Sequence, residues 1–245
     1  MHKITKALIN GIGTSPYYVG QTPDDMLQTF QNEYLTKSGY IDSIVYGVPI
    51  RNGRPIPWIT YSCLDYLERI IPSDYKVVEF GGGFSTLYWA LRGNPITFFE
   101  SDPGWEITIN NGVDLLDPTQ RAKCLPMFRQ SIALEKSLLD ELKKLYLIEN
   151  NVEVKNVKIE ISQFLTDKIN GSELIMIDGI LRNYLLELCA NSKFKGVIVL
   201  DNADRKEYTK GISELESKGW IQTSFSGIGP INPYGWTTSV FHINK

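Results

Sequence analysis

The stretch from Tyr75 to Pro103, YKVVEFGGGFSTLYWALRGNPITFFESDP, constrains the fold of this chain more than any other. An apolar run of strand length leads into three glycines and a helix-like segment, and a second apolar run ends in acidic residues. Such alternation predicts a parallel sheet with right-handed crossovers. Five runs fit strands of that sheet: KVVEF, PITFFES, NVKIEI, ELIMIDG and GVIVLDN. The last segment, WIQTSFSGIGPINPYGWTTSVFHI, predicts an antiparallel hairpin. We therefore expect an α/β fold with a doubly wound seven-stranded sheet, mostly parallel, with an antiparallel C-terminal hairpin strand.

The length of 245 residues and the 42% hydrophobic content suffice for one large core. Residues 1–55 have mixed helix and hairpin signals, and we expect them to form an N-terminal extension or lid. Residues 56–245 then form the main domain. Within it, the amphipathic segment 126–151 predicts a helix that covers the sheet.

Composition argues against several classes of function. A net charge of -3 and a pI near 5.5 provide no broad basic surface for nucleic acid. The apolar runs are too short to span a bilayer, and the N-terminus lacks a signal-peptide core, so we expect a cytoplasmic protein without a membrane partner. The three cysteines, Cys63, Cys124 and Cys189, are too far apart to indicate a zinc cluster or a disulfide framework. The two histidines lie near the chain ends, at positions 2 and 242, which makes histidine-centred catalysis improbable. The oligomeric state stays open.

The glycine loop indicates a nucleoside-like ligand. A strand that leads through glycines into a helix brings backbone N–H groups and the positive helix end close to a ligand. Glu100 lies 19 residues after Gly81, the spacing at which an acid can accept hydrogen bonds from ribose hydroxyls. Thr86 stands where a nicotinamide-binding loop has its third glycine, which disfavours a nicotinamide-dependent oxidoreductase but keeps it as an alternative. Asp102 fits a helix cap and a ligand contact equally well.

These residues resemble the first two motifs of the class I S-adenosylmethionine-dependent methyltransferases, whose Rossmann-like sheet has an antiparallel seventh strand. The resemblance covers roughly residues 58–243. It implies an S-adenosylmethionine-binding methyltransferase domain, with the glycines against the methionine part of the cofactor and the acid of the second strand on the ribose. The cofactor-binding residues that it implies are Glu79, Gly81, Gly83, Ser85, Glu100 and Ser162.

A second polar group follows two later strands, as Asp178 in LIMIDG and as Asp201 and Asn202 in VIVLDN. The carboxyl ends of neighbouring strands face one crevice, and three oxygen donors there suit Mg²⁺ or another divalent cation. The group resembles the metal site of the catechol and caffeoyl-CoA type of O-methyltransferases. Those enzymes have a lysine three residues after the first aspartate, where this chain has Leu181 followed by Arg182. Asp178 and Arg182 are therefore the catalytic candidates, and a metal-free role for Asp178 as a base or substrate anchor stays open.

We expect a methyltransferase that acts on an oxygen of a small molecule or sugar. The motifs DGILRNY and DNADRKEY are similar to a less characterised branch of the same superfamily, which would place four side chains near the substrate: Arg182, Asp204, Arg205 and Tyr208. A surface salt-bridge group is an equal interpretation of these four residues. A non-catalytic methyltransferase-like binding module is the alternative function, because the lysine is missing and the N-terminal extension is rich in aromatic residues.

Overall fold

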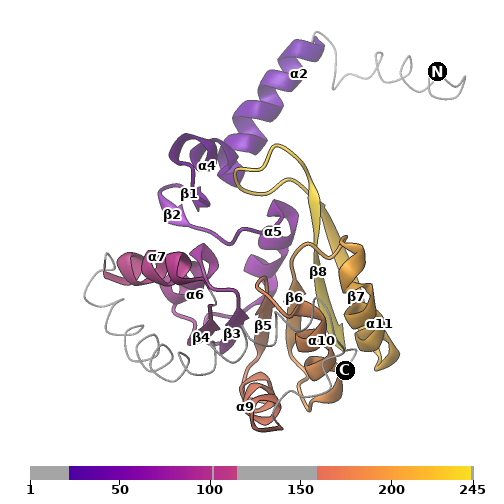
Figure 1. Cartoon of the computed structure of the whole chain (residues 1–245). Coiled ribbons are helices and arrows are strands. Elements are labelled where there is room, and N and C mark those ends of the chain that lie inside the picture. Colours follow the sequence, from indigo (N-terminus) through magenta and orange to yellow (C-terminus); the bar gives the residue numbers. More distant parts are fainter. Residues whose placement is uncertain (1–21, 101, 115–158, 244–245) are drawn as a thin grey trace, which may run out of the picture.

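The computed structural model describes residues 22–100, 102–114 and 159–243, and its centre is a six-stranded sheet of order β4-β3-β5-β6-β8-β7 (Figure 1). Four strands are parallel: β3 (Val77–Phe80), β4 (Ile96–Phe99), β5 (Leu174–Ile177) and β6 (Val197–Leu200). The hairpin of β7 (Trp220–Gly227) and β8 (Trp236–Ile243) adds to this sheet with β8 antiparallel to β6. The fold is thus the expected Rossmann-like α/β arrangement with an antiparallel C-terminal hairpin.

The expected strand NVKIEI is wrong over residues 159–161, which begin helix α9 (Ile159–Asn170). The apolar residues of this segment continue at a spacing of four, through Ile161, Leu165 and Ile169, which is helical rather than strand periodicity. The main sheet therefore has six described strands instead of seven. Residues 156–158, the helix expected at 126–151 and Cys124 lie outside the described residues.

Helices cover both faces of the sheet, as the alternation of strand side chains requires. Val77 and Met176 face a core built with α5 (Tyr61–Ile70), α6 (Phe84–Arg92) and α7 (Pro103–Asp114). Val78 and Ile177, the next residues along the same strands, face the opposite core. That second core contains α9, α10 (Arg182–Asn191) and α11 (Thr209–Ser217). The polar residues after each parallel strand are consequently left at one edge, between the two helical layers.

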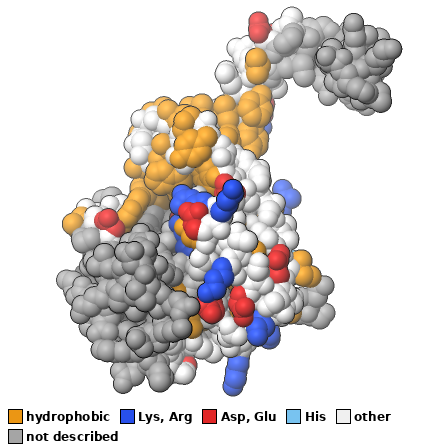
Figure 2. Space-filling model, turned by 45° about the vertical axis from the view of Figure 1, so that its right-hand side comes forward, with side chains coloured by type: hydrophobic (Ala, Val, Ile, Leu, Met, Phe, Trp, Pro, Cys, Tyr) orange, Lys and Arg blue, Asp and Glu red, His pale blue; other side chains and the backbone are white. Residues whose placement is uncertain are grey.

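The N-terminal region forms short helices and a two-stranded ladder. Its elements are α2 (Pro23–Phe30), π-helix η1 (Gln31–Leu35), α3 (Thr36–Ser38), α4 (Tyr40–Tyr46), β1 (Ile50–Arg51) and β2 (Arg54–Pro55). Figure 2 shows hydrophobic side chains gathered over these helices, among them Leu27, Phe30, Ile44, Val45 and Tyr46, which are 49–69% exposed. Tyr40 donates a hydrogen bond of 3.3 Å to the carbonyl of Asn232 in the β7–β8 connection. The division at residue 55 and the lid role stay predictions.

None of the helices within the described ranges combines the length and the apolar character that crossing a bilayer requires.

Candidate functional site

The glycine loop after β3 depends on a close approach between two backbones. Gly81 has a φ of +100°, a conformation that residues with a side chain rarely adopt. A Cβ at Gly81 would lie 2.3 Å from the backbone nitrogen of Gly179, in the turn that follows β5. Gly83 differs, because its φ of 175° is ordinary extended backbone and a Cβ there would lie 3.5 Å from the ring of Trp105. Gly81 is thus required by the fold, whereas Gly83 is not.

Glu79 supports this loop from beneath. Its side chain is fully buried in β3, and its Oε2 accepts a hydrogen bond of 2.5 Å from the hydroxyl of Thr86. That hydroxyl in turn accepts a hydrogen bond of 2.9 Å from the backbone N–H of Gly83. Burial raises the pKa of Glu79 to about 7, because it outweighs the hydrogen bonds that stabilise the charged form. Glu79 therefore holds the loop and does not line the pocket above it.

A pocket of about 280 Å³ lies above the loop, and we name it the glycine-loop pocket. Its lining comes from the loop, the strand ends and two tryptophans: Pro49, Trp58, Gly81, Gly82, Gly83, Phe84, Ser85, Glu100, Trp105, Asp178, Gly179 and Ile180. The loop, the first turn of α6 and the rings of Trp58 and Trp105 all contribute to this lining. Glu100, only 8% exposed, provides a carboxylate at the end of β4.

Asp102 acts as the cap of α7. Its Oδ1 accepts hydrogen bonds from the backbone N–H groups of Gly104 at 2.7 Å and Trp105 at 3.3 Å. Its own N–H donates to Oε1 of Glu100 at 2.6 Å. Of the two interpretations of Asp102, the structure supports the helix cap, which also orients Glu100 and Trp105 toward the glycine-loop pocket.

A second pocket of about 430 Å³, the hairpin pocket, lies beside the β7–β8 connection. Its lining combines carboxylates, amides, one arginine and aromatic rings: Trp58, Asp178, Asp201, Asn202, Asp204, Arg205, Asn232, Tyr234, Gly235 and Trp236. Trp58 and Asp178 line both pockets. The two pockets therefore meet at the end of β5.

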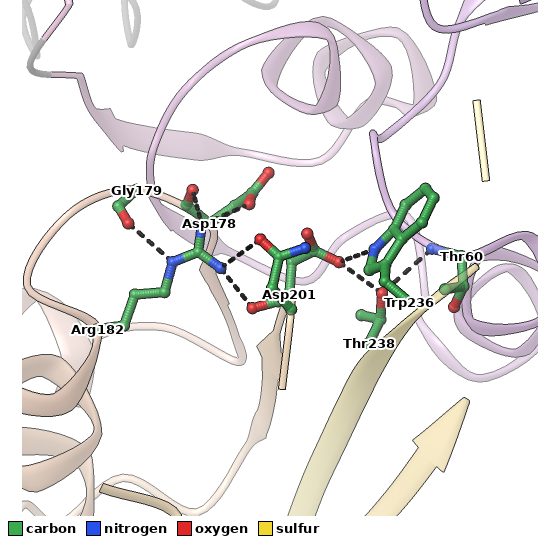
Figure 3. A network of polar contacts seen from close by, with 8 residues as sticks. Thr60, Asp178, Gly179, Arg182, Asp201, Trp236 and Thr238 are labelled. Atoms are coloured by element: carbon green, nitrogen blue, oxygen red, sulfur yellow. Dashed lines mark hydrogen bonds and ion pairs between the residues drawn. The ribbon is translucent and has the colours of Figure 1, made fainter. Parts of the chain in front are cut away.

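The guanidinium of Arg182 joins the ends of β5 and β6 (Figure 3). Its Nε donates to the carbonyl of Gly179 at 2.8 Å, and its Nη2 donates to the carbonyl of Asp178 at 2.6 Å and to Oδ1 of the same residue at 3.1 Å. Its Nη1 donates to the carbonyl of Asp201 and, at 3.3 Å, to Oδ1 of Asn202. The Arg182 side chain is 8% exposed, while that of Asp178 is 27% exposed and reaches the pockets.

Asp201 is turned toward the hairpin. Its Oδ1 accepts hydrogen bonds from Nε1 of Trp236 at 2.8 Å and from the hydroxyl of Thr238 at 2.6 Å. The hydroxyl oxygen of Thr238 also accepts a hydrogen bond of 3.1 Å from the backbone N–H of Thr60. This chain of contacts fastens β8 to β6 and to the start of α5.

Both carboxyl groups at this edge are harder to ionise than ordinary aspartates. Burial raises the pKa of Asp178, the nearby charge of Asp201 raises it further, and Arg182 opposes both effects. Burial also raises the pKa of Asp201, although hydrogen bonds from Thr238 and Trp236 partly compensate. Asp178 is thus the carboxyl group that combines an elevated pKa with access to both pockets.

The structure brings the expected metal ligands together, but their oxygens do not fit a divalent ion as arranged. Oδ1 of Asp178 and Oδ1 of Asn202 both accept hydrogen bonds from Arg182, and Oδ1 of Asp201 accepts two from the hairpin. The cation at the centre of this set is a guanidinium.

Four of the six expected cofactor residues line the glycine-loop pocket: Gly81, Gly83, Ser85 and Glu100. Ser162 does not, since it lies in α9 and its hydroxyl is 2.8 Å from that of Tyr184 in α10. Asp204 and Arg205 line the hairpin pocket, whereas the ring of Tyr208 packs against the Arg182 guanidinium at 5.2 Å.

The sequence interpretation missed the aromatic and amide walls of both pockets: Trp58, Trp105, Asn232, Tyr234 and Trp236. Their signals are present in the segments IPWIT, DPGW and NPYGW. Nothing in these segments, however, indicates that residues so distant along the chain meet at one edge of the sheet.

No protein-family model and no curated protein matches the sequence. Among solved structures, the chain is similar to a putative O-methyltransferase from Klebsiella pneumoniae, with 14% identity over 100% of both chains and a TM-score of 0.46. It is also similar to the O-methyltransferase TomG from Streptomyces achromogenes, with 10% identity over 100% of both chains and a TM-score of 0.44. An O-methyltransferase from Bacillus cereus in complex with SAH matches 89% of this chain with 96% of its own, at 15% identity and a TM-score of 0.40. At these identities and TM-scores, none of the similarities assigns an activity to this chain.

Proposed function

We propose that this chain is an S-adenosylmethionine-dependent methyltransferase that acts on an oxygen of a small molecule or sugar. The observation that carries the proposal is that the glycine-loop pocket and the hairpin pocket meet at Asp178. A donor in the first pocket and an acceptor in the second would face each other across a carboxylate that can take a proton.

The glycine-loop pocket has the groups that the cofactor requires. Backbone N–H groups of the loop and the positive end of α6 suit the carboxylate of its methionine part. Glu100 would accept hydrogen bonds from the ribose hydroxyls, and Trp105 offers an aromatic face. When bound, S-adenosylmethionine supplies an activated methyl group.

The hairpin pocket suits an acceptor with several hydroxyl groups. Hydroxyls both donate and accept hydrogen bonds, and this pocket offers carboxylates, amides and the guanidinium of Arg205. Trp58, Tyr234 and Trp236 add apolar faces against which a ring can pack. The mixture matches a polyhydroxylated ring, such as a sugar, better than a purely apolar molecule.

Asp178 is the base of the proposed reaction. Its carboxylate would accept the proton of the acceptor hydroxyl as the oxygen gains the methyl group. The elevated pKa makes Asp178 a stronger base than an ordinary aspartate. The rest of the catalytic effect would come from alignment of donor and acceptor in two adjoining pockets. Arg182 would act through Asp178, whose carboxylate it orients, and so is a positioning residue in this mechanism.

Calorimetric titration with S-adenosylhomocysteine tests the cofactor assignment. Glu100→Gln should weaken binding by about tenfold, because the amide loses charged hydrogen bonds to the ribose. Asp102→Asn is the matched control, since asparagine also caps helices and residue 102 does not line the pocket. Wild-type protein that binds no S-adenosylhomocysteine, or equal affinities for the two variants, would contradict the proposal.

Methyl transfer itself is measured with radiolabelled S-adenosylmethionine and a panel of phenols, catechols and sugars. Transfer to a hydroxyl supports the proposed reaction. Tight cofactor binding without product from any acceptor would favour a non-catalytic binding module. Binding of NADH in a fluorescence titration, with no binding of S-adenosylhomocysteine, would favour a nicotinamide-dependent oxidoreductase.

A further inference from the structure

The guanidinium of Arg182 contacts all three residues of the second polar group: side-chain oxygens of Asp178 and Asn202, and the backbone carbonyl of Asp201. Its three guanidinium nitrogens make five hydrogen bonds to the turns that follow β5 and β6. Two of the acceptors are Oδ1 of Asp178 and Oδ1 of Asn202, both of which were expected to bind a metal. A guanidinium has five N–H donors, so this environment uses its whole capacity.

We propose that the guanidinium of Arg182 is a built-in cation that takes the place of a divalent metal ion at this site. In this arrangement the chain binds no Mg²⁺ or Mn²⁺ between Asp178, Asp201 and Asn202. Arg182 instead holds Asp178 in position where the two pockets meet. The metal-binding part of this proposal is independent of the proposed function, whereas its catalytic consequence, methyl transfer without a metal, rests on it.

The charge of the site supports this assignment. An arginine side chain is permanently charged at physiological pH, and the Arg182 side chain is only 8% exposed. A divalent ion among the same oxygens would lie beside that positive charge with little water to screen the repulsion. The guanidinium already forms an ion pair with the Asp178 carboxylate, so one of the expected metal ligands has its charge neutralised before any ion arrives.

The geometry of the site supports it as well. Mg²⁺ requires near-octahedral oxygen ligands at about 2.1 Å, which means free lone pairs that point to one centre. Oδ1 of Asp201 instead points to the hairpin, where Trp236 and Thr238 donate to it (Figure 3). On the other side, the ring of Tyr208 lies 5.2 Å from the guanidinium carbon and packs against Arg182.

Manganese titration of the full-length chain, followed by the electron paramagnetic resonance signal of free Mn²⁺, tests the proposal. Wild-type protein should bind no Mn²⁺ that depends on Asp178, so wild type and Asp178→Asn should give the same titration curve. One Mn²⁺ per wild-type chain that is lost in Asp178→Asn would overturn the proposal. Binding that is unchanged in Asp178→Asn lies elsewhere on the chain and agrees with it.

Arg182→Met provides the converse experiment, because it removes the guanidinium and leaves the oxygens. If circular dichroism shows that the variant folds, it should bind Mn²⁺ at least about tenfold more tightly than wild type, and Asp201→Asn in the same background should abolish the gain. Arg205→Met is the matched control. It removes one positive charge from the hairpin pocket but no hydrogen bond to these oxygens, so its effect measures charge alone. Equal Mn²⁺ affinity in Arg182→Met, Arg205→Met and wild type would overturn the claim that the guanidinium blocks the site.

If Arg182→Met does not fold, the comparison of wild type with Asp178→Asn decides the question alone.

A third measurement addresses catalysis. EDTA should change the rate of methyl transfer by less than about twofold, and added Mg²⁺ should not raise it. Loss of transfer in EDTA with recovery on added Mg²⁺ would overturn the proposal even if the methyltransferase assignment holds. Failure of S-adenosylhomocysteine to bind would overturn that assignment and leave the manganese result intact.

Discussion

The glycine-loop pocket is shaped by backbone, whereas the hairpin pocket is shaped by side chains joined through hydrogen bonds. In the first, the turns at Gly81 and Gly179 approach so closely that a Cβ at residue 81 would lie 2.3 Å from a backbone nitrogen. In the second, Asp201 accepts hydrogen bonds from Trp236 and Thr238, and Arg182 donates hydrogen bonds to the residues that follow two neighbouring strands. Added atoms should therefore disrupt the first pocket, whereas removal of one hydrogen-bond donor should weaken the second pocket only modestly.

The difference also lies in how far along the chain each pocket is assembled. Most of the glycine-loop pocket is lined from residues 81–105, which contain the loop after β3, α6, β4 and the first turn of α7. The hairpin network joins residues as far apart as Thr60 and Thr238, separated by 178 positions. The glycine-loop pocket still needs the turn at Gly179, whereas the hairpin pocket needs β8 to pair with β6.

The largest effect is expected from Gly81→Ala. The added methyl group collides with the turn at Gly179, and the φ of +100° is strained for alanine. We expect a loss of about 3 kcal/mol in the free energy of unfolding and loss of S-adenosylhomocysteine binding. Thermal unfolding and calorimetry measure the two effects.

Gly83→Ala is the control within the same loop. Its backbone is extended, and the new methyl group would lie in ordinary contact with the ring of Trp105. We expect its free energy of unfolding to stay within about 0.5 kcal/mol of wild type. Equal destabilisation by Gly81→Ala and Gly83→Ala would show that the close backbone approach does not hold the pocket.

A smaller, pH-dependent effect is expected from Glu79→Gln. The folded chain holds a proton on Glu79 up to a pKa of about 7, above the value of 4.5 expected in the unfolded chain. The folded state therefore binds more protons between these values, so the contribution of Glu79 to stability is complete below pH 4.5 and is lost as the pH rises through 7. Between pH 5 and pH 8 the loss amounts to about 2 kcal/mol.

Glutamine cannot ionise, so Glu79→Gln should lack this loss. Urea unfolding at pH 5 and pH 8 should show the variant gaining about 2 kcal/mol relative to wild type at the higher pH. The same relative stability at both pH values would mean that the carboxyl group ionises easily under the loop. In that case a charged side chain, rather than backbone geometry and a neutral acid, supports the glycine-loop pocket.

The same contrast explains which parts of the molecule the sequence could predict. The fold class and the glycine loop follow from local patterns: apolar strands, glycines and an acid at a fixed spacing. Asp102 was ambiguous because a cap and a ligand use the same carboxylate, and only the hydrogen bonds to Gly104 and Trp105 separate the two. The expected strand at residues 156–161 was wrong over its last three residues, because the apolar spacing of a short run does not distinguish strand from helix until the following turns are included.

The second polar group shows which contacts the sequence could not predict. The sequence correctly placed Asp178, Asp201 and Asn202 at neighbouring strand ends, since strand order in such sheets brings those ends together. It could not show that the side chain of Arg182, four residues after Asp178, forms hydrogen bonds with all three of these residues. The chain enters α10 through Leu181, which has a φ of +60° in the left-handed region. Trp236 and Thr238 likewise reach Asp201 only through the pairing of β8 with β6.

The smallest effect is expected from Trp236→Phe, which removes the indole N–H but keeps an aromatic ring. Oδ1 of Asp201 retains its hydrogen bond from Thr238, so we expect a loss of only about 1 kcal/mol in the free energy of unfolding. Trp236 lines the hairpin pocket but not the glycine-loop pocket, so affinity for S-adenosylhomocysteine should stay within about twofold of wild type. Trp58→Phe is the matched control, because Trp58 lines both pockets and its loss should weaken that binding. If Trp236→Phe weakened S-adenosylhomocysteine binding as much as Trp58→Phe, the two pockets would be one cooperative unit. The backbone would then hold one pocket in shape and side-chain hydrogen bonds the other, but this structural difference would have no effect on function.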